Sequence, residues 1–377
     1  MNACSFTFIS LRNKLPCRVM GIERTWDYLK NEFDRDGNGL SDPTARYFET
    51  IGPGPQLFAV VYPSVYYHDQ QQWFKYKMMR RLIVVVGADV RQGSSVIEAL
   101  LEYSDKWHIR GITGDLTSTY SQELIRRGVK MVKCDINNRE ECCLAFTGAY
   151  GVFAITNYWN ATDGGEYEQA FNLIEAARKV NVQHFIASGI PDTAAFEKNQ
   201  FDLPLHSINK TQLENYIRRL PSDSTFVHVT FIHAGFYYHN FITFFVPYTE
   251  NIEFRHPILS YGRIPMYDVR DTGKIIRECF EHPERWGHRQ TVPIVAEQLT
   301  MEEICKTIQE ISEKDIDFIP LSYDEALVKL HRETVNNLRW YNEFGSTDER
   351  QAEKTKEIYP KIKTFAEWVR ETQWLME

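Results

Sequence analysis

Short apolar runs alternate with amphipathic segments from Arg80 onward. The runs are continuously apolar, which is typical of strands buried on both faces, and the segments between them carry apolar residues every three to four positions, which predicts helices. The runs and their following segments are LIVVVG with SSVIEALLEY, HIRGIT with TYSQELIRRG, VKMVKCDI with REECCLAF, GVFAITN with EYEQAFNLIEAARKV, HFIASG with NKTQLENYIRRL, and finally TFVHVTFI. This order predicts an α/β fold with a Rossmann-type, doubly wound parallel sheet, which binds ligands beyond the carboxyl ends of its strands.

The alternation is confined to part of the chain, which predicts three regions. Residues 80–235 are expected to form a dinucleotide-binding domain, to which 266–300 returns. Further along, the pattern breaks down into aromatic segments, with helices expected at LTMEEICKTIQEI and KTFAEWVRETQW. Residues 236–265 and 301–377 are therefore expected to form a smaller C-terminal α+β domain that covers a substrate. Residues 1–79 are turn-rich and lack a sustained period, which indicates an N-terminal extension.

Composition and charge restrict the possible partners. The formal net charge is -8 and the pI about 5.8, so no basic excess is available for nucleic-acid phosphates or an anionic membrane. No apolar run approaches the roughly 18 residues that span a bilayer. The seven cysteines form no CxxC pair or zinc-site spacing, which favours reduced thiols inside a cell. We expect a cytoplasmic protein, or a nuclear one if its role is regulatory.

One stretch of the extension has a partial metal-site pattern. Asp34, Asp36, Asn38 and Gly39 match the start of an EF-hand loop. Ala45 stands where that loop needs a bidentate Glu, so a solvated turn is the better interpretation. No metal is expected.

The first apolar run ends in a glycine-containing loop, GADVRQG, that leads directly into a predicted helix. Backbone amides and the helix dipole can bind a diphosphate there, which predicts NADP or NAD as the cofactor. The ordinary loop has a third glycine at position 90, and Val90 adds a β-branched side chain that argues for weaker affinity. The candidate cofactor-binding residues of this loop are Gly87, Val90, Arg91, Gln92 and Gly93.

The same loop begins a resemblance to a known family. GxxxRQG followed by SVIEALLE is similar to the glycine loop and first helix of NmrA-like proteins, a mostly fungal branch of the short-chain dehydrogenase/reductase superfamily. Further segments resemble the family in the family's order: ITGD, GVKMVKCDINN, GAYGVFAITNYW, LENYIR, AGFYYHNF, DVRDTGK and EIYPKIKTFAEW. The resemblance covers residues 80–377, and TNYW and DTGK in register are far more specific than a lone glycine loop.

The resemblance implies residues for the adenosine end of a cofactor. The family usually places Arg after the Thr of the second strand, where a cation accepts the 2′-phosphate of NADP. Here Gly114 and Asp115 follow Thr113, which weakens the case for NADP and leaves NAD open. Arg91 is either a substitute cation for that phosphate or a solvated surface residue. Asp135 resembles the family Asp that accepts a hydrogen bond from the adenine amine.

Other matched positions belong to the nicotinamide end. Thr156 and Asn157 end the fourth strand beside the expected nicotinamide ribose. The wider superfamily reduces carbonyls with Tyr-x-x-x-Lys on one helix face, where the lysine lowers the tyrosine pKa. Lys210 resembles that lysine and is expected to hold the ribose, while His206 stands in place of the tyrosine, as a proton donor or as an ordinary cleft histidine. Ser188 resembles the superfamily's hydrogen-bonding serine. The candidate catalytic residues are Lys210, His206 and Ser188.

Aromatic residues with a few polar neighbours offer walls for a small-molecule pocket, although core packing would explain them equally well. The candidate substrate residues are Tyr158, Trp159, Phe236, Tyr237 and Asn240.

Three hypotheses arise for the function. The first is an NAD(P)-dependent oxidoreductase acting on a small organic substrate, because many fungal members of the family are assigned to secondary-metabolite pathways. The second is a redox sensor that binds NAD or NADP without turnover and represses a transcription factor by protein contact, as the family's namesake does; the missing tyrosine favours it. The third is a degenerate fold without cofactor binding, which Val90 and Gly114 suggest. Turnover separates the first two, and dinucleotide binding separates both from the third.

Overall fold

The computed structural model describes residues 80–156, 165–191, 205–221, 226–244, 252–259, 261–344 and 348–374. The chain divides into two units, 1–79 and 80–377, and every described residue belongs to the second. The expected N-terminal extension and its EF-hand-like turn lie outside the described residues. In the described part, no helix is long and apolar enough to cross a membrane.

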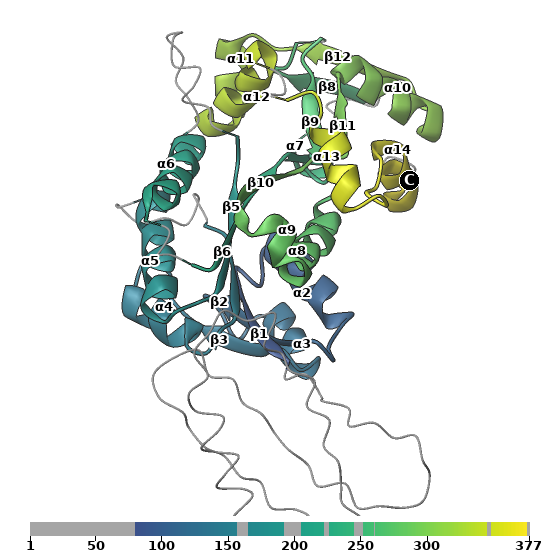
Figure 1. The fold of residues 1–377 in the computed structure, drawn as a ribbon. Coiled ribbons are helices and arrows are strands. Elements are labelled where there is room, and N and C mark those ends of the chain that lie inside the picture. Colours follow the sequence, from purple (N-terminus) through teal and green to yellow (C-terminus); the bar gives the residue numbers. More distant parts are fainter. Residues whose placement is uncertain are drawn as a thin grey trace, which may run out of the picture. The chain divides into compact units, whose positions relative to one another are not determined.

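A seven-stranded parallel sheet forms the centre of the fold (Figure 1). Its order is β10-β6-β5-β4-β1-β2-β3, so the chain runs outward through β2 and β3 and then crosses back to β4 on the other side of β1. This topology confirms the Rossmann-type α/β fold, and the reversal between β1 and β4 is where such sheets bind ligands. The strands are β1 (Arg81–Val86), β2 (Trp107–Thr113), β3 (Lys130–Lys133), β4 (Gly151–Ala154), β5 (His184–Gly189), β6 (His228–Ala234) and β10 (His288–Ile294).

Helices cover both faces of this sheet (Figure 1). Alternate side chains of a strand point to opposite faces, so Ile83 and Val85 join one apolar cluster and Val84 and Val86 the other. The first cluster includes residues of α2 (Arg91–Leu101), α3 (Thr119–Arg126), α8 (Thr272–Glu281) and α9 (Pro283–Trp286). The second includes residues of α4 (Arg139–Phe146), α5 (Gly165–Lys179) and α6 (Leu205–Arg219). Burial on both faces explains why the strand segments are continuously apolar.

Two short sheets and further helices form a smaller lobe beyond the carboxyl edge of the large sheet (Figure 1). One short sheet has the order β11-β9-β7 and the other pairs β12 with β8. The elements are β7 (Phe236–Tyr237), α7 (Asn240–Phe244), β8 (Ile252–His256), β9 (Ile264–Tyr267), the 3-10 helix η5 (Val269–Asp271), β11 (Glu297–Leu299), α10 (Met301–Ser312), β12 (Ile316–Pro320), α11 (Tyr323–Lys329), α12 (Arg332–Phe344), α13 (Gln351–Ile358) and α14 (Phe365–Thr372).

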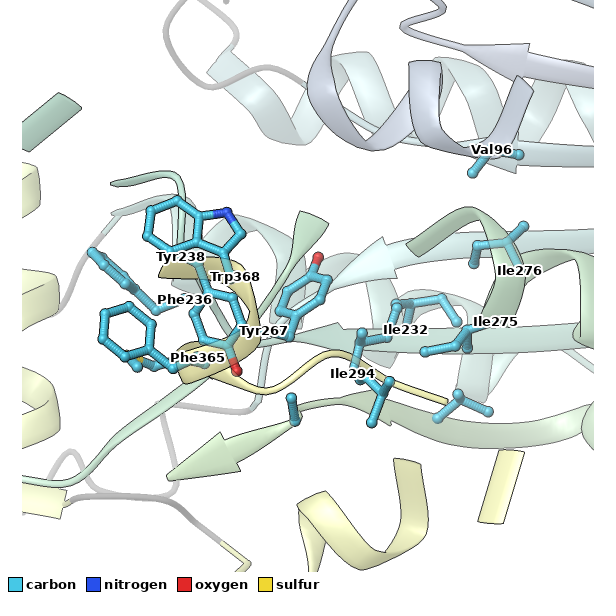
Figure 2. Packing of buried hydrophobic residues seen from close by; sticks show 14 of the residues in the cluster. Val96, Ile232, Phe236, Tyr238, Tyr267, Ile275, Ile276, Ile294, Phe365 and Trp368 are labelled. Atoms are coloured by element: carbon cyan, nitrogen blue, oxygen red, sulfur yellow. The ribbon is translucent and has the colours of Figure 1, made fainter. Parts of the chain in front are cut away.

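The smaller lobe shares its core with one face of the large sheet. The ring of Tyr238 lies 5.2 Å from that of Phe365 and 5.8 Å from that of Trp368, centroid to centroid. Figure 2 shows this aromatic group continuing through Tyr267 to the aliphatic residues of the sheet, including Ile232. One continuous core therefore holds the lobe above the strand ends, where the sequence places the candidate site.

Candidate functional site

The glycine loop lies between β1 and α2, at the reversal of the strand order. Gly87 has a positive φ of 65°, and the amide of Ala88 donates to the carbonyl of Ile112 at 2.9 Å, which ties the loop to β2. A Cβ on Gly93 would lie 1.8 Å from the carbonyl oxygen of Gly87. Gly87 is therefore required by its backbone conformation, and Gly93 by the close approach of the backbone at Gly87. This close approach lets α2 begin directly beside the loop.

Val90, at the third-glycine position, fits the loop without backbone strain. Its φ of -95° and ψ of 161° are ordinary extended values. No side chain caps the amino end of α2, whereas Ser118 and Asn138 cap the helices α3 and α4. An uncapped helix start offers its amides and the positive end of its dipole to an anion. The loop therefore fits a diphosphate, with exposed Arg91 as the first residue of the helix.

The end of β2, where the sequence predicts the adenosine ribose, carries acidic groups. Thr113 is buried, and its hydroxyl donates to Oδ2 of Asp89 at 2.8 Å. A Cβ on Gly114 would meet nothing within 4 Å, so this position offers space and no cation. The hydroxyl and the amide of Thr117 hold the pKa of Asp115 below its ordinary value. Asp89 therefore joins the candidate site, although sequence reasoning did not single it out.

Asp135, the candidate adenine-binding residue, lies just beyond β3 and is exposed. Its Oδ1 accepts hydrogen bonds from the amide (2.9 Å) and the side-chain nitrogen (2.8 Å) of Asn137. The side chain is thus held in a local turn, and its second oxygen is available to a ligand.

Lys210 of α6 reaches the end of β4, where it meets a buried acid. Its Nζ lies 2.8 Å from Oε1 of Glu166 and donates to Oγ1 of Thr156 at 3.2 Å. The Thr156 hydroxyl donates to the same Glu166 oxygen at 2.6 Å. Glu166 is 1% exposed, and its Oε2 has no hydrogen-bond partner in the described part of the chain. The buried carboxylate therefore holds Lys210 and Thr156 together.

Sequence reasoning missed Glu166, although a signal exists. Glu166, Ala170 and Leu173 follow helical spacing on the buried face of α5. An acidic residue on an otherwise apolar face needs a partner, because an unpaired buried charge is costly. Only the fold shows that the partner is Lys210, on a different helix.

Gln92 connects the glycine-loop helix with two other parts of the site. It is 2% exposed; its Oε1 accepts from the hydroxyl of Ser188 at 2.7 Å, and its Nε2 donates to the hydroxyl of Tyr267 at 3.3 Å. These bonds join α2 to the end of β5 and to β9. Ser188 therefore lies at the expected strand end, and its oxygen can still accept a hydrogen bond.

A pocket lies beside Lys210, between the sheet and helices α5 and α6. Its cavity volume is about 30 Å³, which is about the space of one water molecule. Nε2 of His233 lies 2.7 Å from Oε2 of the lining residue Glu214. Burial alone would raise the pKa of Glu214, but His233 and Arg218 outweigh it and lower that pKa. The lining residues are Ala154, Thr156, Ala170, Leu173, Ile174, Phe185, Ala187, Ser188, Gly189, Lys210, Leu213, Glu214, Ile217 and Phe231.

Several predicted positions are only partly described. The main chain of His206 lies in α6, one turn before Lys210, and its side chain lies outside the described residues. Asn157, Tyr158 and Trp159 also lie outside the described residues.

The remaining substrate candidates belong to β7 and α7. Phe236 is 8% exposed and packs edge-on against Phe241 and Tyr341, so it contributes to the core of the smaller lobe. The ring of Tyr237 lies 5.5 Å from that of Tyr267, and burial raises the pKa of Tyr237 to about 12. Asn240 is half-buried at the start of α7. By exposed surface, Tyr237 and Asn240 are half-buried, whereas Phe236 is buried.

Comparison with known sequences identifies relatives of this chain. Residues 79–369 match the model of the NmrA-like family. An NmrA-like family domain-containing protein of Dictyostelium discoideum is 27% identical over 273 residues, which are 71% of this chain and 89% of that protein. The NmrA-like family domain-containing oxidoreductase FrzB of a Cladobotryum species is 28% identical over 264 residues, which are 64% of this chain and 77% of that protein.

Solved structures show the same fold. NmrA, a negative transcriptional regulator crystallised with NAD, superposes with a TM-score of 0.66 at 21% identity, over 78% of this chain and 95% of that one. A structure of NmrA with NADP superposes with a TM-score of 0.65, also at 21% identity and with the same coverage. At this level of identity the likeness concerns the fold.

Proposed function

Because the chain belongs to the NmrA-like family, we propose that it is an NAD(P)-dependent oxidoreductase that acts on a small organic substrate in a secondary-metabolite pathway. One observation carries this proposal: Lys210, Thr156 and Ser188 gather at the ends of β4 and β5, where Ser188 is hydrogen-bonded to Gln92 of the glycine loop. Relatives such as FrzB, which is named an oxidoreductase, support the same activity. A cytoplasmic location is part of the proposal.

Each end of the site has its own task in this proposal. The amides at the start of α2 bind the diphosphate, and Asp135 contacts the adenosine. Thr113 is buried and serves the adenosine end by holding Asp89. Lys210 and Thr156 hold the nicotinamide ribose together with Asn157. A bound reduced nicotinamide would supply a hydride.

The substrate side of the proposal starts from the loss of the superfamily tyrosine. His206 precedes Lys210 by one helical turn and donates the proton that a reduced carbonyl needs. Ser188 donates a hydrogen bond to the substrate oxygen after releasing Gln92. Tyr237 and Asn240 are proposed to contact the substrate, while Tyr158, Trp159 and Phe236 stay predictions from the sequence.

The test is a turnover screen with the whole chain. Purified protein is mixed with NADH or NADPH and a panel of aldehydes, ketones and quinones, and the loss of reduced-nicotinamide absorbance is followed. Lys210→Met combined with Glu166→Gln, which leaves no unpaired buried charge, is expected to lower kcat/KM by about a hundredfold or more, since it removes a group that contacts the cofactor. Lys179→Met is the matched control, because Lys179 forms an exposed ion pair with Glu140 on the outside of α5. Equal activity of the two variants would contradict the proposed role of Lys210.

One observation favours a second candidate function. His206 replaces the tyrosine on which superfamily catalysts depend, which suits a sensor that binds a dinucleotide without turning it over. In that role the protein contacts a transcription factor, in the cytoplasm or the nucleus, and does not bind nucleic acid directly. Tight dinucleotide binding with no turnover across the panel would favour the sensor over the enzyme.

A further inference from the structure

We propose that Asp89 makes the cofactor site selective for NAD and NADH over NADP and NADPH, an inference that rests on the proposed function. The two kinds of dinucleotide differ only at the 2′ position of the adenosine ribose. In Rossmann-type sites a carboxylate about 20 residues past the glycine loop accepts a hydrogen bond from the 2′-hydroxyl, at the end of the second strand. In this chain the glycine loop itself supplies a carboxylate at that strand end.

Two hydrogen bonds hold Asp89 over the end of β2. The amide of its neighbour Ala88 donates to the carbonyl of Ile112 at 2.9 Å, and the Thr113 hydroxyl donates to Asp89 Oδ2 at 2.8 Å. The amide of Asp115 donates to the same Thr113 oxygen at 3.0 Å. Thr113 is 2% exposed, so its hydroxyl has a fixed environment, whereas Asp89 is exposed to a ligand. Thr113 occupies one carboxylate oxygen and leaves Oδ1 to accept from a ribose hydroxyl.

The charges at this strand end favour a hydroxyl over a phosphate. Asp115 adds a second carboxylate, whose pKa the hydrogen bonds from Thr117 hold below its ordinary value. Gly114 supplies no cation. Lys133 of β3 pairs with Thr113 in the sheet register, and its charge also lowers the pKa of Asp115. This lysine offsets part of the negative charge at the strand end. A phosphate monoester carries roughly two negative charges near neutral pH, so two carboxylates with one lysine oppose it.

Arg91 is the one cation in the glycine loop, residues 87–93, and its charge acts on the smaller lobe. Burial lowers the pKa of His239, and the neighbouring charge of Arg91 lowers it further. His239 lies between β7 and α7 of the smaller lobe. Arg91 is also the first residue of α2, beside the amides proposed to bind the diphosphate, so it is assigned to that side of the site and not to a 2′-phosphate.

Calorimetric titration of the whole chain tests the selectivity by binding alone. The wild type is expected to bind NADH at least about tenfold more tightly than NADPH, and Asp89→Asn is expected to remove most of that ratio. Asp89→Asn combined with Gly114→Arg is expected to favour NADPH. Asp105→Asn is the matched control, because Asp105 is an exposed Asp before β2, at the opposite end of the strand, and the ratio should stay at the wild-type value.

The possible outcomes separate this inference from the proposed function. A wild type that binds both dinucleotides equally, or prefers NADPH, overturns the role of Asp89 and leaves the oxidoreductase proposal standing. An unchanged ratio in a folded Asp89→Asn variant overturns the role of Asp89 as well. If neither dinucleotide binds, the proposed function fails, and the inference fails with it.

Discussion

The ion pair of Lys210 and Glu166 makes the stability of the fold depend on two residues of the candidate site. Glu166 is 1% exposed and Lys210 Nζ lies 2.8 Å from its Oε1, so removing the lysine leaves a buried carboxylate without a cation. We expect Lys210→Met to lower the free energy of unfolding by about 3–5 kcal/mol in urea titrations. The double variant Glu166→Gln with Lys210→Met is expected to recover most of that loss, since no charge then remains buried.

The exposed ion pair of Lys179 and Glu140 provides the comparison for the Lys210→Met and double variants. Lys179→Met is expected to leave the free energy of unfolding almost unchanged, because solvent screens that pair. If Lys210→Met proved equally harmless, or if the double variant were no more stable than the single one, Glu166 would not be the residue that holds Lys210.

At the residue scale, the sequence predicts positions that belong to a spaced motif and misses those that only the fold brings together. Lys210 was predictable from its place in a family segment. Glu166 and Asp89 stand in no such motif, and their partners Lys210 and Thr113 lie in other elements. The pairing of an acid on one helix with a lysine on another depends on how the helices pack, which periodicity does not specify.

At the scale of elements, the position of α2 depends on close contact with α8. A Cβ on Gly273 would lie 1.9 Å from the carbonyl oxygen of Ser95, and the Ser95 hydroxyl accepts from the amide of Gly273 at 2.9 Å. The glycine of the DTGK segment, which resembles a family motif, is thus needed because any side chain would collide with the backbone of α2. Because α2 begins at the glycine loop, this contact also sets the geometry of the proposed diphosphate site.

Gly273→Ala tests the packing of α2 against α8. Alanine is the better helix former by up to about 1 kcal/mol, but a backbone oxygen at 1.9 Å forces the helices apart. Such overpacking typically costs about 1–3 kcal/mol, so we expect a net loss of unfolding free energy and weaker dinucleotide binding. Gly114→Ala, whose Cβ would enter open space, should unfold like the wild type. Identical urea midpoints for both variants would refute the close contact.

Elements with strong apolar periodicity were predictable, and weakly periodic ones were not. The six alternating runs correspond to β1–β6, and the helices expected at 299–311 and 363–374 correspond to α10 (Met301–Ser312) and α14 (Phe365–Thr372). The edge strand β10 begins HRQT, whose polar residues hide the period. The helix α13, QAEKTKEI, buries few residues and has no clear apolar face. Tertiary contacts, which local pattern does not record, stabilise both.

At the scale of the whole molecule, one continuous core joins the smaller lobe to the sheet. It runs from Ile83 in β1 through Tyr267 to Trp368 in α14. Figure 2 shows the part of this core between Ile232 and Trp368. The lobe therefore stands over the carboxyl ends of the strands as part of the same folded unit, and the hydrogen bond from Gln92 to Tyr267 reaches into it. A ligand on the strand ends would contact residues from both the sheet and the lobe.

Hydrogen–deuterium exchange with and without NADH most directly tests the claim that the carboxyl edge of the sheet binds a dinucleotide. We expect slower exchange at amides in 87–93, 113–115 and 188–189, because bound cofactor would cover them, and no change in 102–106, before β2 at the opposite edge. Protection confined to other segments, or no protection at saturating NADH, would contradict the account.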